Sequence, residues 1–308
     1  MLAGKRRSGY DVLVLGGGIA GLSAASQAAQ YGLSAVLLEP SALLGGQVAT
    51  VTSVEGFPSL GAIAGGELAA ILLTQARQQG VILIEEAAQA VTTVGMQFQV
   101  ATTSQNLRAR AVIVATGGRL RELDLAKERE FLGKGLSHCA SCDGPLFRNE
   151  HVVVVGGGDA ALQEAALLAR ICRSVTVIVR GTLRARRAFV NRAKSLGNLT
   201  FVWDSVIEAI CGDSAVTGVV VRNLETGARQ EIPCAGLFPF IGTVPNTEFL
   251  AESVEKDPQG HLRTDESLAT SRNGIYAIGA VRRGFSGELA SAAADGAAVV
   301  KTIAAQNL

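Results

Sequence analysis

Two glycine-rich turns, each placed between an apolar segment and an Ala-rich segment, constrain the fold of this chain more than any other feature. In the first, Gly16, Gly18 and Gly21 follow an apolar run at Asp11–Leu15 and precede a helical stretch that extends to about Tyr31. Such glycines allow a tight bend, close approach of a phosphate group and close packing of helix on strand, in that order. This segment therefore predicts a strand–turn–helix unit that binds a dinucleotide.

An acidic residue completes this first unit. A second apolar run, Ser34 to Leu38, ends in Glu39, where a carboxylate can accept hydrogen bonds from ribose hydroxyls. The glycine triplet alone is a weak signal, but strand, helix, second strand and acid together are specific. The predicted dinucleotide ligands of this unit are Gly16, Gly18, Ile19, Ala20, Gly21 and Glu39.

The second turn repeats the pattern. A strand is expected at His151–Val155, and Gly156, Gly158 and Ala161 give the spacing G-x-G-x-x-A before a helix that extends to about Ala169. Two such motifs in one chain of this length predict two dinucleotide sites. The predicted ligands of the second site include Gly157, Gly158, Asp159 and Ala160.

The strand that follows the second turn ends differently. The run Ser174–Val179 has no acid at its end, and Arg180, Arg184, Arg186 and Arg187 follow it closely. An acid here suits a free ribose 2′-hydroxyl, whereas arginines accommodate a 2′-phosphate. Arg180 and Arg184 are therefore candidate phosphate ligands. The alternative is that these arginines only form the solvated start of a helix.

A closely spaced cysteine pair lies just before the second unit. Cys139 and Cys142 are separated by two residues and followed directly by Asp143, which can give or take a proton beside the sulfurs. In a chain with βαβ patterns this spacing indicates a redox dithiol. The alternative is half of a zinc site, which needs a second ligand pair. None is found in the sequence, because the other cysteines lie far apart: Cys172, Cys211 and Cys234. No metal is expected.

Composition excludes several classes. The 308 residues, 48% of them hydrophobic, predict about two domains with buried cores. A net charge of +1 and 5% aromatic residues argue against nucleic acid and against an acidic membrane surface as partners. No apolar run reaches the ~18 residues of a spanning helix, and Gly16–Gly18 interrupt the run that otherwise suggests a signal peptide. Five cysteines form no disulfide framework, so a reducing, cytoplasmic location is expected.

The remaining segments predict the fold class. The runs Val91–Thr102 and Leu107–Thr116 are each expected to form a strand of a small antiparallel element, and Leu199–Glu208 to form another strand. After Gly242 the pattern of the first unit returns, with an apolar strand at Ile275–Gly279 and an Ala-rich helix at Gly287–Ala305. These segments favour an α/β protein of two Rossmann-like dinucleotide-binding domains with three-layer ββα and βαβ architecture.

The order and spacing of these motifs are specific together, and they extend over nearly the whole chain. The chain resembles the low-molecular-weight thioredoxin reductases, a family of FAD/NAD(P)-linked disulfide oxidoreductases. Besides the first turn, the matching segments are Gly45-Gly46-Gln47, Ala115-Thr116-Gly117, Cys139–Gly144, Gly156-Gly157-Gly158-Asp159 and Gly242–Thr247.

The resemblance implies a discontinuous FAD-binding domain, residues 1–117 and 244–308, and an inserted NAD(P)-binding domain, residues 118–243, that carries the cysteine pair. It also implies that electrons pass from NAD(P)H through FAD to the disulfide, and then to a thioredoxin-like protein or a small disulfide. Cys139 then exchanges with substrate, Cys142 lies nearer the flavin and Asp143 carries the proton. A homodimer is implied as well. Further cofactor ligands carried over by resemblance are Gly46, Gln47, Thr116, Gly117, Gly279, Ala280, Glu288 and Leu289.

Several positions depart from the family pattern. The family commonly has Gly-Asp where this chain has Gly279-Ala280, and Arg-Gln where it has Glu288-Leu289. The family's His-Arg-Arg stretch reads Val179-Arg180-Gly181 here, with a shorter spacer before Arg184. The NADPH phosphate motif is thus altered. His138 replaces a common aromatic residue next to the first cysteine, where a cation could lower the thiol pKa.

Other functions stay open at this point. A nicotinamide-independent dithiol oxidase would reverse the electron flow, and a reductase fed by a second flavin or a ferredoxin would keep its direction. A non-enzymatic flavoprotein sensor is a further class, but a sensor needs no exchangeable dithiol, and the set Cys139, Cys142 and Asp143 is complete. No motif encodes the identity of the disulfide or dithiol substrate.

Overall fold

The computed structural model describes residues 9–306, except residues 55–56, 59 and 251–253. The chain divides into two compact units. The first consists of Met1–Arg119 and Val244–Leu308, and the second of Leu120–Thr243. Each unit is built on a sheet whose central strands are parallel and which begins with a strand, a glycine turn and a helix.

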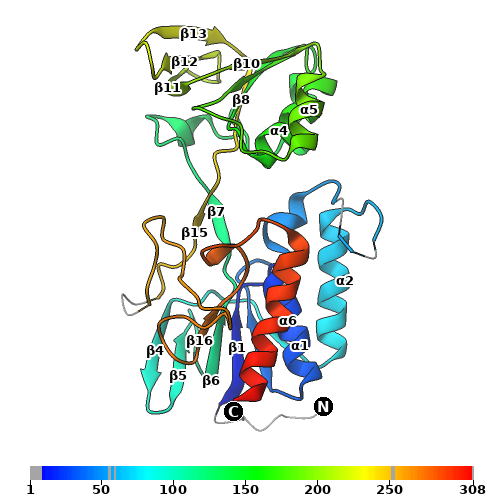
Figure 1. Ribbon diagram of the computed structural model, residues 1–308, viewed down its shortest axis with the longest axis vertical. Coiled ribbons are helices and arrows are strands. Elements are labelled where there is room, and N and C mark those ends of the chain that lie inside the picture. The colour runs from blue at the N-terminus through cyan, green and yellow to red at the C-terminus, as the bar shows by residue number, and fades with distance from the viewer. Residues whose placement is uncertain (1–8, 55–56, 59, 251–253, 307–308) are drawn as a thin grey trace. The chain divides into compact units, whose positions relative to one another are not determined.

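The sheet of the first unit has seven strands in the order β3-β2-β1-β6-β5-β4, with β16 also paired to β6 (Figure 1). Pairs β1–β2, β2–β3, β1–β6 and β6–β16 are parallel, and the hairpin β4–β5 joins β6 antiparallel. The strands are β1 (Tyr10–Leu15), β2 (Ala35–Leu38), β3 (Ile82–Ile84), β4 (Ala90–Val94), β5 (Gln97–Ala101), β6 (Asn106–Val114) and β16 (Ile275–Ala277).

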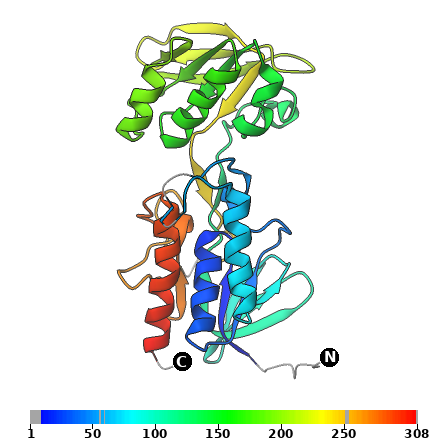
Figure 2. The same cartoon turned by 90° about the vertical axis from the view of Figure 1, so that its right-hand side faces the viewer.

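Helices α1 (Ile19–Gln30), α2 (Gly65–Gln78) and α6 (Leu289–Ala305) lie side by side on one face of this sheet (Figures 1 and 2). Strand β1 is apolar from Val12 to Leu15, because both of its faces are buried there. Val12 and Val14 pack in the core under the helices, whereas Leu13 and Leu15 pack in the core of the opposite face. This double burial fixes the position of the glycine turn at the end of β1.

One expected strand of this unit is a hairpin instead. The segment 91–102 turns at Gly95, which has φ +63°, so that Val91 pairs with Val100 across β4 and β5. The apolar pattern continues through the turn, and it therefore suggested a single long strand. A short 3₁₀ helix, η1 (Gly46–Thr50), occupies part of the segment that reads as a loop.

The second unit has a four-stranded parallel sheet in the order β10-β9-β8-β14. Helices α4 and α5 pack on one face, and the antiparallel sheet β11-β12-β13 packs on the other. The elements are η2 (Glu128–Phe131), α3 (Ala140–Asp143), η3 (Gly144–Phe147), β8 (His151–Val155), α4 (Asp159–Ile171), β9 (Ser174–Ile178), α5 (Arg187–Lys194), β10 (Leu199–Val202), β11 (Ser205–Cys211), β12 (Gly218–Asn223), β13 (Arg229–Pro233) and β14 (Gly236–Pro239).

The prediction of one strand at residues 199–208 is wrong in the same way as the prediction at residues 91–102, because this segment also forms two strands. It breaks at Trp203 and Asp204, and Asp204 has a positive φ of 49°. The break sends β10 and β11 into different sheets. A non-glycine residue in the left-handed region leaves little trace in the apolar pattern.

The chain passes from one unit to the other along β7 (Gly118–Leu120) and returns along β15 (Thr243–Pro245), and these strands pair with each other. A last 3₁₀ turn, η4 (Gly279–Val281), follows β16. The predicted fold class, an α/β protein of two Rossmann-like units, is confirmed. Within the described part of the chain, no helix has both the length and the apolar character needed to cross a membrane.

Candidate functional site: two glycine turns and a dithiol

The first glycine turn is packed tightly on its protein side and open on the other. An added Cβ would lie 2.4 Å from the Ala115 carbonyl oxygen at Gly16, and 1.9 Å from the Gly16 oxygen at Gly21. At Gly18 an added Cβ would meet nothing within 4 Å. Since α1 begins at Ile19, this open side faces the N–H groups of a helix start, which bind anions such as a pyrophosphate.

Glu39 is held against this turn. Its Oε2 accepts a hydrogen bond from the Gly17 N–H at 2.7 Å, and its Oε1 accepts one from the Ser41 N–H at 2.9 Å. The carboxylate is therefore fixed at the end of β2, next to the turn. This is the position at which an acid can accept hydrogen bonds from the ribose of a dinucleotide.

Other predicted cofactor residues gather around the same turn. The Gly45 N–H donates to the Gly17 oxygen at 2.8 Å, and an added Cβ at Gly46 would lie 3.5 Å from the Cα of Gly18. Gln47 donates through Nε2 to the Gly118 oxygen at 2.6 Å. Thr116 and Gly117 follow directly after Ala115, so both predicted ligands lie beside the turn.

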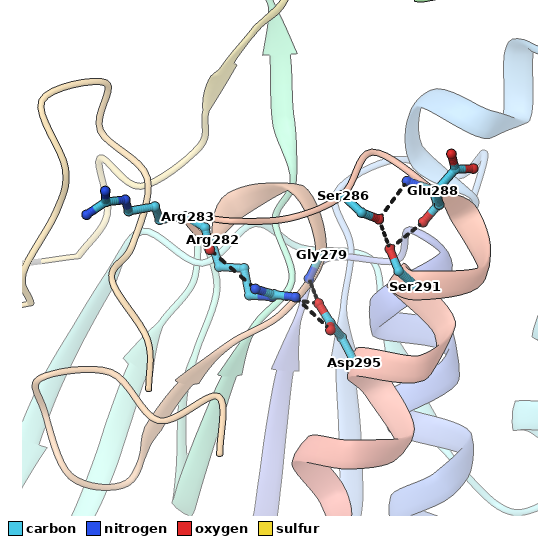
Figure 3. Close-up of polar contacts among 7 residues, drawn as sticks. All are labelled: Gly279, Arg282, Arg283, Ser286, Glu288, Ser291 and Asp295. Atoms are coloured by element: carbon cyan, nitrogen blue, oxygen red, sulfur yellow. Dashed lines mark hydrogen bonds and ion pairs between the residues drawn. The ribbon is translucent and has the colours of Figure 1, made fainter. Parts of the chain in front are cut away.

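A segment near the C-terminus also lies beside the first glycine turn. Gly279, with φ +68°, abuts the first turn of α1, because an added Cβ would lie 3.0 Å from the Cβ of Ala20. Glu288 precedes Leu289, the first residue of α6, and the Ser291 hydroxyl donates to the Glu288 oxygen at 2.9 Å (Figure 3). The residues of the first unit thus form an open cradle that fits a dinucleotide such as FAD.

The second glycine turn has the same shape. At Gly156, with φ +137°, an added Cβ would lie 2.2 Å from the Phe240 oxygen and 3.0 Å from the Cβ of Ala161. At Gly158 it would meet nothing within 4 Å. This turn is again tight on its protein side and open at the start of a helix, α4, so it can also receive a pyrophosphate.

The arginine segment folds back onto this second turn. The N–H groups of Arg184 and Ala185 donate to the Gly157 oxygen at 2.8 and 3.2 Å. Arg186 donates through its backbone N–H and its Nε to the carboxylate of Asp159, both at 2.7 Å. Asp159, predicted as a cofactor ligand, is therefore occupied by Arg186.

The other arginines of this segment are available to a ligand. Arg180, Arg184 and Arg187 are exposed, and none of their side chains forms a hydrogen bond or ion pair with a residue that the structure describes. Unpaired guanidinium groups near an open glycine turn suit a phosphate.

The cysteine pair forms a disulfide at the start of a short helix. Cys139 caps α3 and is bonded to Cys142. The Ser137 hydroxyl donates to Oδ2 of Asp143 at 2.6 Å and accepts from the Cys139 N–H at 3.0 Å. The buried Ser137 thus ties the acid to the backbone of the first cysteine. Sequence reasoning missed Ser137, because a lone serine near the pair carries no recognisable signal.

The remaining cysteines are poor nucleophiles. Burial raises the pKa of Cys172 to about 11 and that of Cys234 to about 12, and it also raises the pKa of Cys211. These thiols stay protonated near neutral pH, whereas the thiolate is the reactive form. Among the described residues there is no cluster of His, Cys, Asp or Glu that could hold a metal ion.

Two further side chains, one on α4 and one after the disulfide, have no sequence signature. Burial raises the pKa of Glu164 on α4, and its Oε2 is buried without a hydrogen-bond partner among the described residues. Leu146 lies four residues after Cys142 and is 77% exposed, which is high for a large apolar side chain.

Two open glycine turns and an exchangeable disulfide in one chain define a dinucleotide-dependent disulfide oxidoreductase. Comparisons with known proteins agree. The family model described as pyridine nucleotide-disulphide oxidoreductase matches residues 10–297. The thioredoxin reductase of Treponema pallidum is 40% identical over 293 residues, which are 94% of each chain.

Solved structures show the same likeness. Lactococcus lactis thioredoxin reductase superposes with a TM-score of 0.92 at 33% identity, over 97% of this chain and all of that one. The thioredoxin reductase of T. acidophilum superposes with a TM-score of 0.90 at 30% identity, over 97% of this chain and 98% of that one. The chain therefore belongs to the pyridine nucleotide-disulphide oxidoreductase family, among the low-molecular-weight thioredoxin reductases.

The family membership settles the class of function. The chain is an FAD-dependent disulfide oxidoreductase, and the predicted enzyme class is confirmed. The alternatives of a dithiol oxidase or of a reductase fed by another donor are not favoured by these relatives.

Proposed function

We propose that this protein reduces the disulfide of a thioredoxin-like protein with electrons from NADPH. FAD binds to the domain of residues 1–117 and 244–308, and the nicotinamide nucleotide to the domain of residues 118–243. The observation that carries the proposal is the Cys139–Cys142 disulfide with Asp143 bonded to Ser137, in a chain that holds two open glycine turns.

In the first unit, the helix start at Ile19 and the open side of Gly18 receive the pyrophosphate, and Glu39 receives the adenosine ribose. Gly46, Gln47, Thr116 and Gly117 surround the turn, and Gly279, Ala280, Glu288 and Leu289 supply the last contacts. When bound, FAD supplies the relay of two electrons between the nicotinamide and the cysteine pair.

The cysteine pair changes between a disulfide and two thiols. Reduction breaks the S–S bond with two electrons and two protons, and Asp143 holds one of these protons beside the sulfurs. The Cys139 thiolate then attacks a sulfur of the substrate disulfide and displaces one thiolate, which takes the proton from Asp143. Cys142 attacks Cys139 in the mixed disulfide, releases the second substrate thiol and restores the Cys139–Cys142 bond.

The second unit binds NADPH in preference to NADH. Gly157, Gly158 and the start of α4 receive the pyrophosphate, and Arg180 and Arg184 receive the 2′-phosphate. Gly181 stands where the family has a further arginine, so we expect NADPH to be used less well than by ordinary family members.

An exposed apolar side chain beside the redox pair supports a protein substrate. Leu146 offers an exposed apolar side chain that a protein partner can bury, as the anchor residues of protein interfaces are buried. The thioredoxin reductases to which this chain is similar carry a protein substrate in their names. We further propose that the enzyme is a cytoplasmic homodimer, in keeping with its likeness to that family.

The test is an anaerobic titration of the purified, FAD-loaded protein with NADPH, NADH or a small dithiol, with flavin absorbance as the readout. Bleaching by NADPH at lower concentration than by NADH, followed by reduction of thioredoxin, supports the proposal. Cys139→Ser and Cys142→Ser should each abolish turnover of the disulfide substrate but retain FAD. Negligible bleaching by both nucleotides would contradict NADPH as the donor, and bleaching by the dithiol alone would indicate an oxidase.

A further inference from the structure

A buried ion pair holds the turn at Gly279, and the dinucleotide motif does not account for it. Arg282 donates to Asp295 through Nε at 2.7 Å and Nη2 at 2.9 Å, and the Gly279 N–H donates to Oδ2 of the same carboxylate at 2.9 Å (Figure 3). The two side chains are 17% and 11% exposed. Arg283 points away from this cluster.

Contacts other than the ion pair also hold α6 in place. Gly296 allows α6 to approach α1 so closely that an added Cβ would lie 2.7 Å from the Ala24 nitrogen. The Ser23 hydroxyl also donates to the Ala293 oxygen at 2.8 Å. Burying two charges is unfavourable unless their geometry is good, and a pair of similar apolar side chains often serves stability as well. The ion pair therefore holds the Gly279 turn in place by bonding it to α6, a helix whose position other contacts already fix.

The turn offers an unused hydrogen-bond donor beside the first dinucleotide cradle. Gly279 abuts Ala20 in the first turn of α1. Ala280 is half-buried, and its N–H makes no hydrogen bond with a described residue. A backbone N–H next to a helix start is a typical donor to an anion. The resemblance also places an acid at this position in related chains, whereas alanine stands here, so the side chain offers no polar contact.

We propose that Arg282 and Asp295 are positioning residues for FAD: they fix the Gly279 turn so that the Ala280 N–H donates to the diphosphate of the cofactor. The inference rests on the proposed FAD site in the first unit. Asp295 acts through the turn and Arg282 acts through Asp295, and neither touches the cofactor.

The experiment measures FAD affinity by fluorescence quenching of FAD as it binds to the apoprotein. In Asp295→Asn, the amide oxygen can still accept from Gly279, but the carboxylate fork for Arg282 is lost. We expect about tenfold weaker FAD binding, on the scale of one charge-assisted hydrogen bond. Arg282→Met should weaken binding similarly, and the double variant should be no weaker than either single variant. Arg283→Met is the matched control and should bind FAD as the wild type does.

The affinity for ADP shows whether the lost contact is with the diphosphate or with the flavin part of FAD. ADP carries the adenosine and the diphosphate of FAD but lacks the ribityl chain and the flavin, so its affinity for the first unit should fall by the same factor in Asp295→Asn. Loss of affinity for FAD but not for ADP would overturn the assignment to the diphosphate.

Thermal unfolding separates positioning from simple stabilisation. If the pair positions the turn, the rise in Tm caused by FAD should shrink in Asp295→Asn, because that rise follows the affinity. Equal drops in Tm for apoprotein and FAD-bound protein, with an unchanged rise, would overturn the inference. Arg282→Lys keeps the charge but loses the paired Nε and Nη2 contacts with Asp295, so FAD binding should still weaken. This variant serves where Asp295→Asn does not fold, and wild-type FAD affinity in it would overturn the inference as well. Failure of the wild type to bind FAD would overturn the proposed function, and this inference with it.

Discussion

The two glycine turns of this protein share a shape but differ in the charge that surrounds them. In the first, the acid Glu39 accepts a hydrogen bond from the turn itself. In the second, the turn accepts hydrogen bonds from the backbone of an arginine segment, and the nearby acid Asp159 is bound to Arg186. The first turn therefore offers a carboxylate to its ligand, and the second offers the guanidinium groups of Arg180 and Arg184.

The two turns share the groups that can bind a pyrophosphate and differ in the side chains that can distinguish one ribose from another. The open glycine and the helix start are common to both turns, so they bind what FAD and NADPH share, which is a pyrophosphate. In the proposed function, the residues at the end of the second strand of each unit select the ribose that is accepted. The same backbone can thus be selective for either nucleotide through a few side chains.

The largest effect is expected at the third position of the motif, where the first turn has Gly21 and the second has Ala161. In Gly21→Ala the new Cβ would lie 1.9 Å from the Gly16 oxygen, so the backbone must shift. We expect a destabilisation of about 3 kcal/mol and loss of FAD binding at micromolar concentrations. Urea unfolding and FAD titration measure both.

The reverse substitution is the matched control. Ala161→Gly removes a methyl group from a helix and should cost only about 1 kcal/mol, with NADPH binding retained. Equal effects of the two substitutions would show that the turns do not differ in packing at this position.

A charge reversal at the end of β9 should exchange the preference of the second unit. Arg180→Glu removes a phosphate ligand and supplies an acid like that of the first unit. The KM for NADPH should rise roughly 100-fold, on the scale of a lost bidentate pair, while NADH use improves. Arg170→Glu, on the exposed side of α4, introduces the same charge and should change neither. An unchanged nucleotide preference in Arg180→Glu would exclude this arginine as the phosphate ligand.

The sequence predicted the common features of the two turns better than their surroundings. Glycines at fixed spacing after an apolar strand constrain the backbone by sterics alone, so the fold class and the family followed from them. Ser137 and the pair Arg282–Asp295 could not be found in this way. Their partners are brought close by tertiary packing, and a hydrogen bond such as that from Ser137 to Asp143 leaves no periodic pattern. The strand breaks at Gly95 and Trp203 were missed for a similar reason, because the apolar pattern continues across both.

An acid restored at the late turn should make the first site bind more tightly. In Ala280→Asp the new carboxylate follows Gly279 beside the first turn of α1, where the resemblance places a ligand of the ribityl chain. A charge-assisted hydrogen bond contributes about 1.5–3 kcal/mol, so FAD affinity should rise at least tenfold. NADPH affinity of the second unit should stay the same. Weaker FAD binding in this variant would mean that the acid is repelled by the diphosphate and that the turn contacts only that group.

The smallest effect concerns alkaline stability, and it distinguishes the units because all five cysteines lie in the second. Burial raises the pKa of Cys234 from 9.0 to about 12 and that of Cys172 from 9.0 to about 11. The unfolded chain ionises first, so the stabilisation is complete below about pH 9 and is lost as the pH rises through the folded values. The loss should be on the order of 1 kcal/mol per pH unit. Trp203 is the single tryptophan of the chain and lies in the second unit, so its fluorescence follows that unit. Its urea midpoint should fall between about pH 9 and 11, and Cys234→Ala should reduce the slope. A midpoint that falls equally steeply in Cys234→Ala would mean that another group governs the alkaline loss.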